Sequence, residues 1–258
     1  MLPANPQNLF VSFDENTIRT FAQNSFPDGS KVYRDFWYFG LHLWVQMDFH
    51  EITLRQLIRP DWQLDSLNWY QIMYGIASRL RVVHSAGVFH GDLKPSNGTH
   101  CSRRILIKLV LLDYDSGSIT WRNVHLSDFG ITSMSQVVIP VLGVAKVLPG
   151  TLSYMPPEIR HHGQTYHTPA SDIWALGCIG HEMCLGGRLS YGLNRAAIDS
   201  VVAGGPLELP PVDDTRYGYL IREIIRRCLV RDPQYRMTID QLCQALESAA
   251  AEARVQFL

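Results

Sequence analysis

The sequence reads His90-Gly91-Asp92-Leu93-Lys94-Pro95-Ser96-Asn97 directly after a long helical pattern. Within six positions, from Asp92 to Asn97, the stretch joins an acid, a cation and an amide. An ordered combination of this length arises by chance far more rarely than a tripeptide does. It is therefore a specific signal, and the neighbouring sequence can be interpreted around it.

Asp128-Phe129-Gly130 lies further along the chain, after two candidate strands at 110–113 and 124–126. On the other side of the loop, the segment 66–85 has the spacing of an amphipathic helix that Gly87 ends. Its apolar positions recur every three or four residues: Ile72, Met73, Ile76, Leu80 and Val83.

The remaining chain divides into an extended and a helical part. Residues 31–47 are rich in aromatic and β-branched residues around Gly40, which predicts a hairpin of two strands. Thr238, with Gln241 three residues later, has the pattern of a capping box. Helices are predicted at 14–21, 156–161, 171–185, 195–203, 217–229 and 238–252. Strands followed by a mostly helical body predict an α+β fold.

Composition excludes several classes of protein. The net charge of −1 provides no field that favours nucleic acid or an acidic membrane surface. Apolar runs stay well below the roughly 18 residues that cross a bilayer, and no secretory signal is visible. The five cysteines form no CxxC pair, and four of them have the apolar neighbours of reduced core cysteines. We therefore expect an intracellular protein, cytoplasmic or nuclear, with no nucleic-acid or membrane partner.

The loop at 90–97 together with Asp128-Phe129-Gly130 resembles the catalytic and metal-binding loops of eukaryotic-type Ser/Thr protein kinases. The resemblance continues in the family's order over residues 31–246. It comprises a hinge at 46–51, the end of an activation segment at Gly150-Thr151, Tyr154 and Met155-Pro156-Pro157-Glu158, a buried helix at 172–177, and Arg236 as the partner of Glu158.

The resemblance implies a protein kinase-like fold with a truncated N-terminal β lobe and a mainly helical C-lobe. Residues 1–30 are weakly patterned and lie before the kinase domain, which covers 31–258. Within that domain, residues 31–47 form the N-lobe hairpin, 48–51 the hinge and 52–258 the C-lobe.

The resemblance also assigns roles in catalysis. Asp92 would orient the substrate hydroxyl and accept its proton, and Lys94 would offset the charge of the transferring phosphoryl group. Asn97 and Asp128 would hold Mg²⁺ through oxygen ligands. Lys94 together with Thr151 fits the Ser/Thr branch of the family. The predicted partner is therefore a protein substrate or, if the chain is a non-catalytic module, a partner kinase.

ATP would lie beneath the hairpin. Met47 takes the gatekeeper position, the backbone of Asp48 and His50 would meet the adenine, and Leu111 would form the floor of the site.

Other residues have structural interpretations. His90 is predicted to be a core histidine, Asp172 an anchor for the catalytic-loop backbone, and Glu158 with Arg236 a buried ion pair. The cluster of His161, His162 and His167 lacks a further ligand of suitable spacing, and we expect it in a solvated loop rather than a metal site.

The sequence departs from the family at four points. No G-x-G-x-x-G motif occurs before residue 90, and Lys31 is the only lysine before Lys94. Gly91 replaces an arginine that normally receives an activation-loop phosphate. The stretch 98–109 looks inserted, either as a surface loop or as an error in the gene model.

Two hypotheses follow. The chain is either a Ser/Thr kinase domain without the first part of its N-lobe, or a catalytically weak or inactive pseudokinase that binds or competes for proteins. The absent glycine loop and lysine predict weak Mg-ATP binding, because each charge-assisted contact is worth about 1.5–3 kcal/mol.

Overall fold

The computed structural model describes ten segments of the chain, to which every structural statement below refers. They are residues 35–39, 42–46, 52–58, 64–95, 110–112, 119–126, 133–134, 152–161, 167–187 and 211–254. The predicted helices at 14–21 and 195–203 lie outside these residues.

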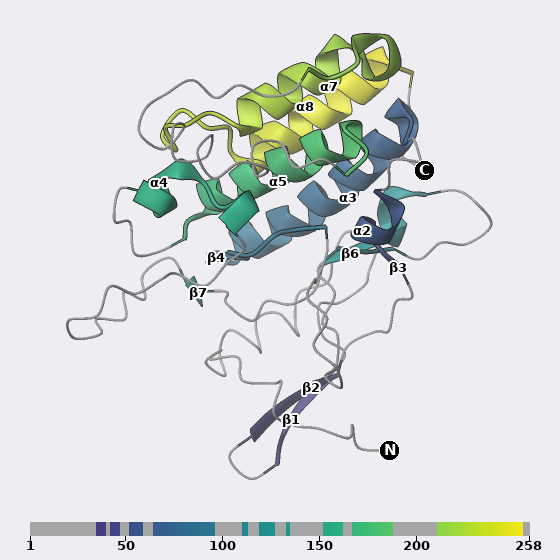
Figure 1. Ribbon diagram of the computed structural model, residues 1–258. Helices are drawn as coiled ribbons and strands as arrows, with labels where there is room; N and C mark the ends of the chain where they lie inside the picture. The colour runs from purple at the N-terminus through teal and green to yellow at the C-terminus, as the bar shows by residue number, and fades with distance from the viewer. Residues whose placement is uncertain are drawn as a thin grey trace.

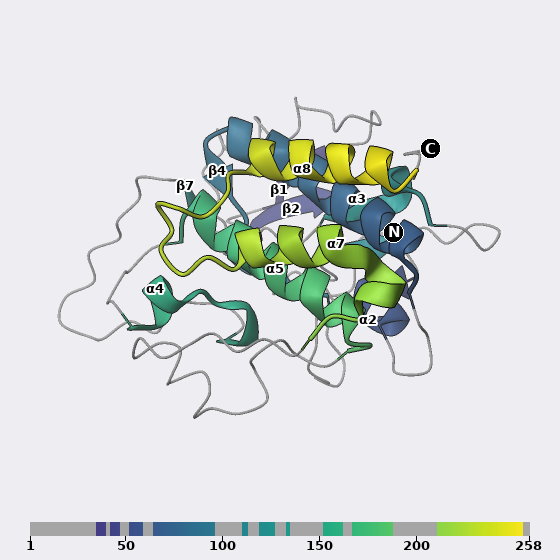
Figure 2. The ribbon, with the colours of Figure 1, turned by 90° about the horizontal axis from the view of Figure 1, so that it is seen from above.

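Four long helices form the body of the protein, and they lie side by side (Figures 1 and 2). Helix α3 packs against α8, and α5 packs against α7. The long helices are α3 (Ser66–Ser85), α5 (Pro169–Cys184), α7 (Asp214–Cys228) and α8 (Ile239–Glu252). All four match the predicted helical patterns to within about three residues.

Local sequence explains where these helices begin and end. The Asp65 side chain accepts a hydrogen bond from the Asn68 backbone N–H at 2.8 Å and so caps α3. Thr238 and Gln241 form the predicted capping box at the start of α8. Gly87, at φ +73°, follows α3 with a backbone conformation that favours glycine.

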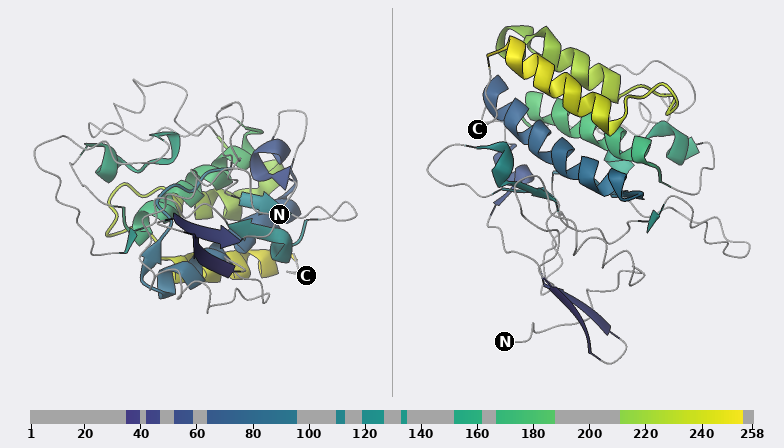
Figure 3. Two further views of the ribbon diagram at one scale, coloured as in Figure 1. Left: turned by 90° about the horizontal axis from the view of Figure 1, so that it is seen from below. Right: turned by 180° about the vertical axis from the view of Figure 1, so that it is seen from behind.

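Short elements surround the bundle. They are α2 (Leu54–Leu57), η2 (Trp121–Asn123), η3 (Leu152–Tyr154) and α4 (Pro157–His161), with strands β1 (Asp35–Phe39), β2 (His42–Gln46), β3 (Ile52–Thr53), β4 (Val88–Phe89), β5 (Val110–Leu112), β6 (Val124–Leu126) and β7 (Ser133–Met134). The predicted hairpin is confirmed, because β1 and β2 pair antiparallel. Figure 3 shows it at the end of the molecule away from the helices.

Two small sheets place the loops that the sequence singles out. One has the order β3-β5-β6, with both pairs antiparallel. In the other, β4 pairs with β7, so that Phe89 lies opposite Ser133. Strand β4 directly precedes His90, and β7 follows Gly130 by three residues. The second sheet therefore brings the chain before the loop that begins at His90 next to the chain after Asp128-Phe129-Gly130.

The core lies between the four long helices α3, α5, α7 and α8. Trp69 and Trp174 are among its largest fully buried side chains, and the Trp69 indole N–H donates to the Gly180 carbonyl oxygen at 2.8 Å, which ties α3 to α5. Cys178, Cys228 and Cys243 are reduced and buried as predicted, whereas Cys184 is only partly buried.

At Gly177, α5 lies directly against the end of α7. A Cβ added there would lie 2.7 Å from the Cys228 Cβ and 2.9 Å from Leu229. We expect Gly177→Ala to lower the free energy of unfolding by about 1–3 kcal/mol, because the two helices would have to move apart. Urea denaturation measures this change, and an unchanged midpoint would show that the contact can relax freely.

No helix among the described residues has the length and apolar character that crossing a membrane requires.

Candidate active site

The loop that begins at His90 is fixed by Asp172 from α5. One carboxylate oxygen of Asp172 accepts from the His90 N–H at 2.7 Å, and the other accepts from the Gly91 N–H at 2.8 Å. The imidazole of His84, at the end of α3, contacts the same carboxylate at 2.9 Å. The predicted role of Asp172 as a backbone anchor is confirmed by these contacts.

Electrostatics favour the ionised form of this anchor. Burial alone would raise the pKa of Asp172, but the hydrogen bond from His84, the neighbouring imidazoles and the Gly91 N–H more than offset burial. The pKa of the carboxyl group therefore lies below its ordinary value, and Asp172 stays charged at neutral pH.

The loop is also held at its other end. The Pro95 carbonyl oxygen accepts from the Arg55 backbone N–H on α2 at 2.8 Å. Between the two anchors, Gly91 has φ +82°, a left-handed conformation that glycine adopts without strain. His90 is fully buried, and its Nδ1 accepts from the Asp92 N–H at 3.3 Å. His90 is thus a core histidine, as predicted.

Asp92 and Lys94 form an ion pair between these anchors. The Lys94 Nζ lies 2.5 Å from the Asp92 Oδ2, and each side chain is 15% exposed. A carboxylate and an ammonium group are thus held together on a fixed loop that still meets solvent. This pair can accept a proton from a bound hydroxyl group and offset negative charge beside it.

A small pocket opens beside this pair. Its lining comes from the catalytic loop, from the segment before α4 and from the start of α5, and includes Asp92, Leu93, Tyr154, Met155, Pro156 and His167. His167 is buried, so the expectation of a solvated histidine loop was wrong for this residue. It directly precedes Thr168, the N-cap of α5, and lines the pocket together with Ser171 and Ala175 of that helix. Among the described residues, no group of three or more His, Cys, Asp or Glu could hold a metal ion.

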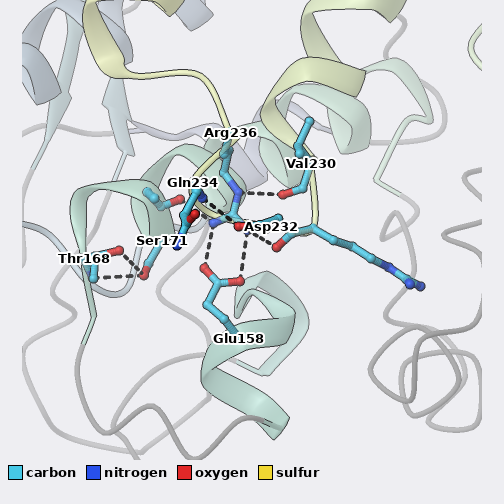
Figure 4. Close-up of polar contacts among 9 residues, drawn as sticks. Glu158, Thr168, Ser171, Val230, Asp232, Gln234 and Arg236 are labelled. Carbon is cyan, nitrogen blue, oxygen red and sulfur yellow. Dashed lines mark hydrogen bonds and ion pairs between the residues drawn. The ribbon is translucent and has the colours of Figure 1, made fainter.

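The segment beyond the pocket is held by a buried ion pair (Figure 4). Arg236 donates to both carboxylate oxygens of Glu158, at 2.7 and 2.9 Å. It also donates to the carbonyl oxygens of Ala170, Val230 and Arg231. The predicted pairing is confirmed, and it ties α4 to the turn between α7 and α8.

A third buried carboxylate, Glu182, was not foreseen from the sequence. Glu182 of α5 accepts from the Tyr154 hydroxyl and from the Arg55 guanidinium, both at 2.6 Å. Burial raises the pKa of Glu182, although both contacts work in the opposite direction. Glu182 thus links two elements. Through Arg55 it contacts α2, which binds the Pro95 carbonyl oxygen at the end of the loop, and through Tyr154 it contacts the pocket wall at 154–156. The sequence contained one signal for this buried carboxylate, namely a glutamate inside an apolar helical pattern.

Similarity to known proteins identifies the family of this chain. Residues 31–246 match the family model described as the protein kinase domain. The chain belongs to the protein kinase family. The chain is 32% identical over 196 residues to the Serine/threonine-protein kinase PKZ1 of Phytophthora infestans (strain T30-4), covering 69% of this chain and 45% of that protein. It is 28% identical over 228 residues to the Serine/threonine-protein kinase RUNKEL of Arabidopsis thaliana, covering 88% and 15%.

The chain thus spans less than half the length of these two relatives, both of which are named Ser/Thr protein kinases. Of its predicted site residues, the structure describes Asp92 and Lys94 fully and brings them together. Leu111 lies in β5, with its backbone opposite Thr53. Met47, Asp48, His50, Asn97 and Asp128 lie outside the described residues and stay predictions, as do Lys31 and the stretch 98–109.

Proposed function

We propose that this kinase transfers the γ-phosphoryl group of ATP to Ser or Thr hydroxyl groups of protein substrates. The observation that carries the proposal is the Asp92–Lys94 pair on a loop held at both ends. Phosphoryl transfer requires mainly positioning and charge stabilisation from the protein, and such a loop supplies both.

In this proposal, the Asp92 carboxylate orients the substrate hydroxyl and takes its proton as the oxygen attacks the γ-phosphorus. Lys94, whose ammonium group already lies beside that carboxylate, offsets the charge of the phosphoryl oxygens. The Asp172 anchor keeps the loop backbone still during the transfer, because it fixes two successive N–H groups.

Asn97 and Asp128 are the residues proposed to hold Mg²⁺, since amide and carboxylate oxygens are the hard ligands that this ion prefers. When bound, Mg²⁺ would neutralise charge on the ATP phosphates. The adenine would meet the backbone of Asp48 and His50 between Met47 and Leu111. Because the pocket with Tyr154, Met155 and Pro156 on its wall is lined by Asp92, it is the proposed place for the substrate segment that carries the hydroxyl group.

The second candidate is a non-catalytic module that binds a protein substrate or a partner kinase. It is favoured by one sequence observation: no G-x-G-x-x-G motif precedes residue 90, and Lys31 is the only lysine before Lys94. Without these phosphate contacts, the helical lobe could still present a docking surface for proteins.

Calorimetric titration with Mg-ATP separates the candidates. We expect binding weaker by roughly ten- to several-thousand-fold than in a complete kinase, in the high micromolar to millimolar range or beyond, because one or two charge-assisted phosphate contacts are absent. Asp128→Asn should remove the magnesium dependence of this weak binding. Tight magnesium-dependent binding that Asp128→Asn abolishes would overturn the weak-affinity prediction. No binding at several millimolar would favour the module.

A further inference from the structure

Arg79 is a fully buried arginine on α3 that the proposed catalysis does not use. It stands on the apolar side of the helix, three residues after Ile76 and seven after Ile72. Burying a charged group is unfavourable unless hydrogen bonds compensate. The guanidinium group donates to the carbonyl oxygens of Trp121 at 3.0 Å and Arg122 at 2.8 Å. A buried arginine therefore binds the backbone of η2.

Arg79 acts with two other residues on the same stripe of α3. The Gln71 side-chain oxygen accepts from the Trp121 N–H at 2.9 Å, so α3 binds both the N–H and the C=O of Trp121. A Cβ at Gly75 would lie 2.6 Å from the Val124 Cβ and 2.7 Å from the Trp121 oxygen. Residues 71, 75 and 79 are four apart, and they lie above one another on one face of the helix. Together they hold η2 and the start of β6 directly against α3.

The position of η2 determines where the chain leaves the sheet. Helix η2 continues without a break into β6, whose Val124 and Leu126 are buried. Asp128 follows Leu126 by two residues. Holding η2 on α3 therefore also fixes the strand from which the chain continues toward Asp128.

The same helix also sets the position of the catalytic loop. His84, near the end of α3, contacts the Asp172 carboxylate that fixes His90 and Gly91. A single rigid helix thus binds the segment that leads to Asp128 on its side and the anchor of Asp92 at its end.

We infer that Arg79 is a positioning residue for phosphoryl transfer: by holding η2 on α3, it fixes β6, the strand that leads to Asp128, on the helix whose end also holds the anchor of Asp92. This inference rests on the proposed kinase function. In the proposed reaction Arg79 contacts no reacting atom. It acts on the site only by holding the backbone of residues 121–126.

Hydrogen–deuterium exchange of the full chain tests the positioning itself. In Arg79→Met, which removes the donors at similar length, we expect amides of residues 119–131 to exchange roughly tenfold faster or more, because two charge-assisted hydrogen bonds are lost. Amides of α5 and α8 should keep their rates. Arg81→Met, two residues along the same helix and partly exposed, is the matched control and should change neither region.

Exchange that rises equally in all helices, or that does not change at 119–131, would overturn the inference. If Arg79→Met does not fold, Arg79→Lys is used in its place. Lysine retains the positive charge but lacks the planar guanidinium group that donates to two carbonyl oxygens. The same regional pattern is then expected with a smaller increase.

Magnesium dependence separates positioning from stability. In calorimetric titrations at fixed ATP, Arg79→Met should weaken the apparent Mg²⁺ affinity by roughly tenfold, while ATP binding without Mg²⁺ stays as in the wild type. A merely destabilised variant would lose both in proportion to its unfolded fraction, and that result would overturn the inference. If the wild type itself binds no Mg-ATP, the proposed function fails, and the exchange experiment still decides the role of Arg79.

Discussion

Glu158→Ala is expected to lower the free energy of unfolding by about 3–5 kcal/mol, because it leaves the guanidinium group of Arg236 buried without a counter-charge. The Arg236 side chain is 0% exposed and the Glu158 side chain 8%, so water cannot replace the lost carboxylate. The guanidinium group also lies over the Trp174 ring, 5.1 Å from its centroid, which keeps it from turning outward. Urea unfolding at neutral pH measures the loss.

An exposed ion pair of the same protein is the matched control. Asp214 and Arg222 form a pair on α7 whose side chains are 41% and 44% exposed. Because solvent screens such a pair, Asp214→Ala should change stability by less than about 1 kcal/mol. A Glu158→Ala unfolding curve that overlays the wild-type curve, or a loss no larger than that of Asp214→Ala, would contradict a buried structural pair.

Asp92→Asn is expected to lower the rate of phosphoryl transfer at several millimolar Mg-ATP by about 10²–10⁴-fold, the usual contribution of a positioned general base. The amide keeps the shape of the side chain and an oxygen that can still meet Lys94, but it cannot take the hydroxyl proton. The melting temperature should therefore change little. Initial rates of labelled phosphate transfer to Ser- and Thr-containing peptides measure the effect.

The exposed Asp240 on α8 supplies the control for this assay, because Asp240→Asn makes the same change on an exposed helix surface and should leave the rate unaltered. Equal rates in the wild type and Asp92→Asn would show that Asp92 is not the base.

The sequence predicted those contacts that a short motif defines. The loop at 90–97, the anchor Asp172 and the partners Glu158 and Arg236 occur in the family's order, so their roles could be stated before any coordinates. The Thr238 capping box was predictable for a different reason: it acts within one turn of helix and needs no knowledge of the fold.

Contacts between distant segments could not be predicted in this way. Glu182 meets Arg55 across 127 positions of sequence, and Arg79 meets Trp121 across 42. Hydrophobic periodicity does place Arg79 on the buried face of its helix, but it cannot say which backbone the guanidinium group binds. The error at His167 has a related cause, since a histidine in a polar stretch gave no sign that the fold would bury it.

The relative position of Asp92 and Asp128 is the most direct test of the proposed kinase site. A crystal structure of the chain with Mg²⁺ and a non-hydrolysable ATP analogue at millimolar concentration would measure it. We predict that the two carboxylates face one cleft within about 10 Å of each other, because both must reach a single phosphoryl group and its metal ion. Carboxylates on opposite faces of the molecule would contradict the assignment of this loop as a kinase active site.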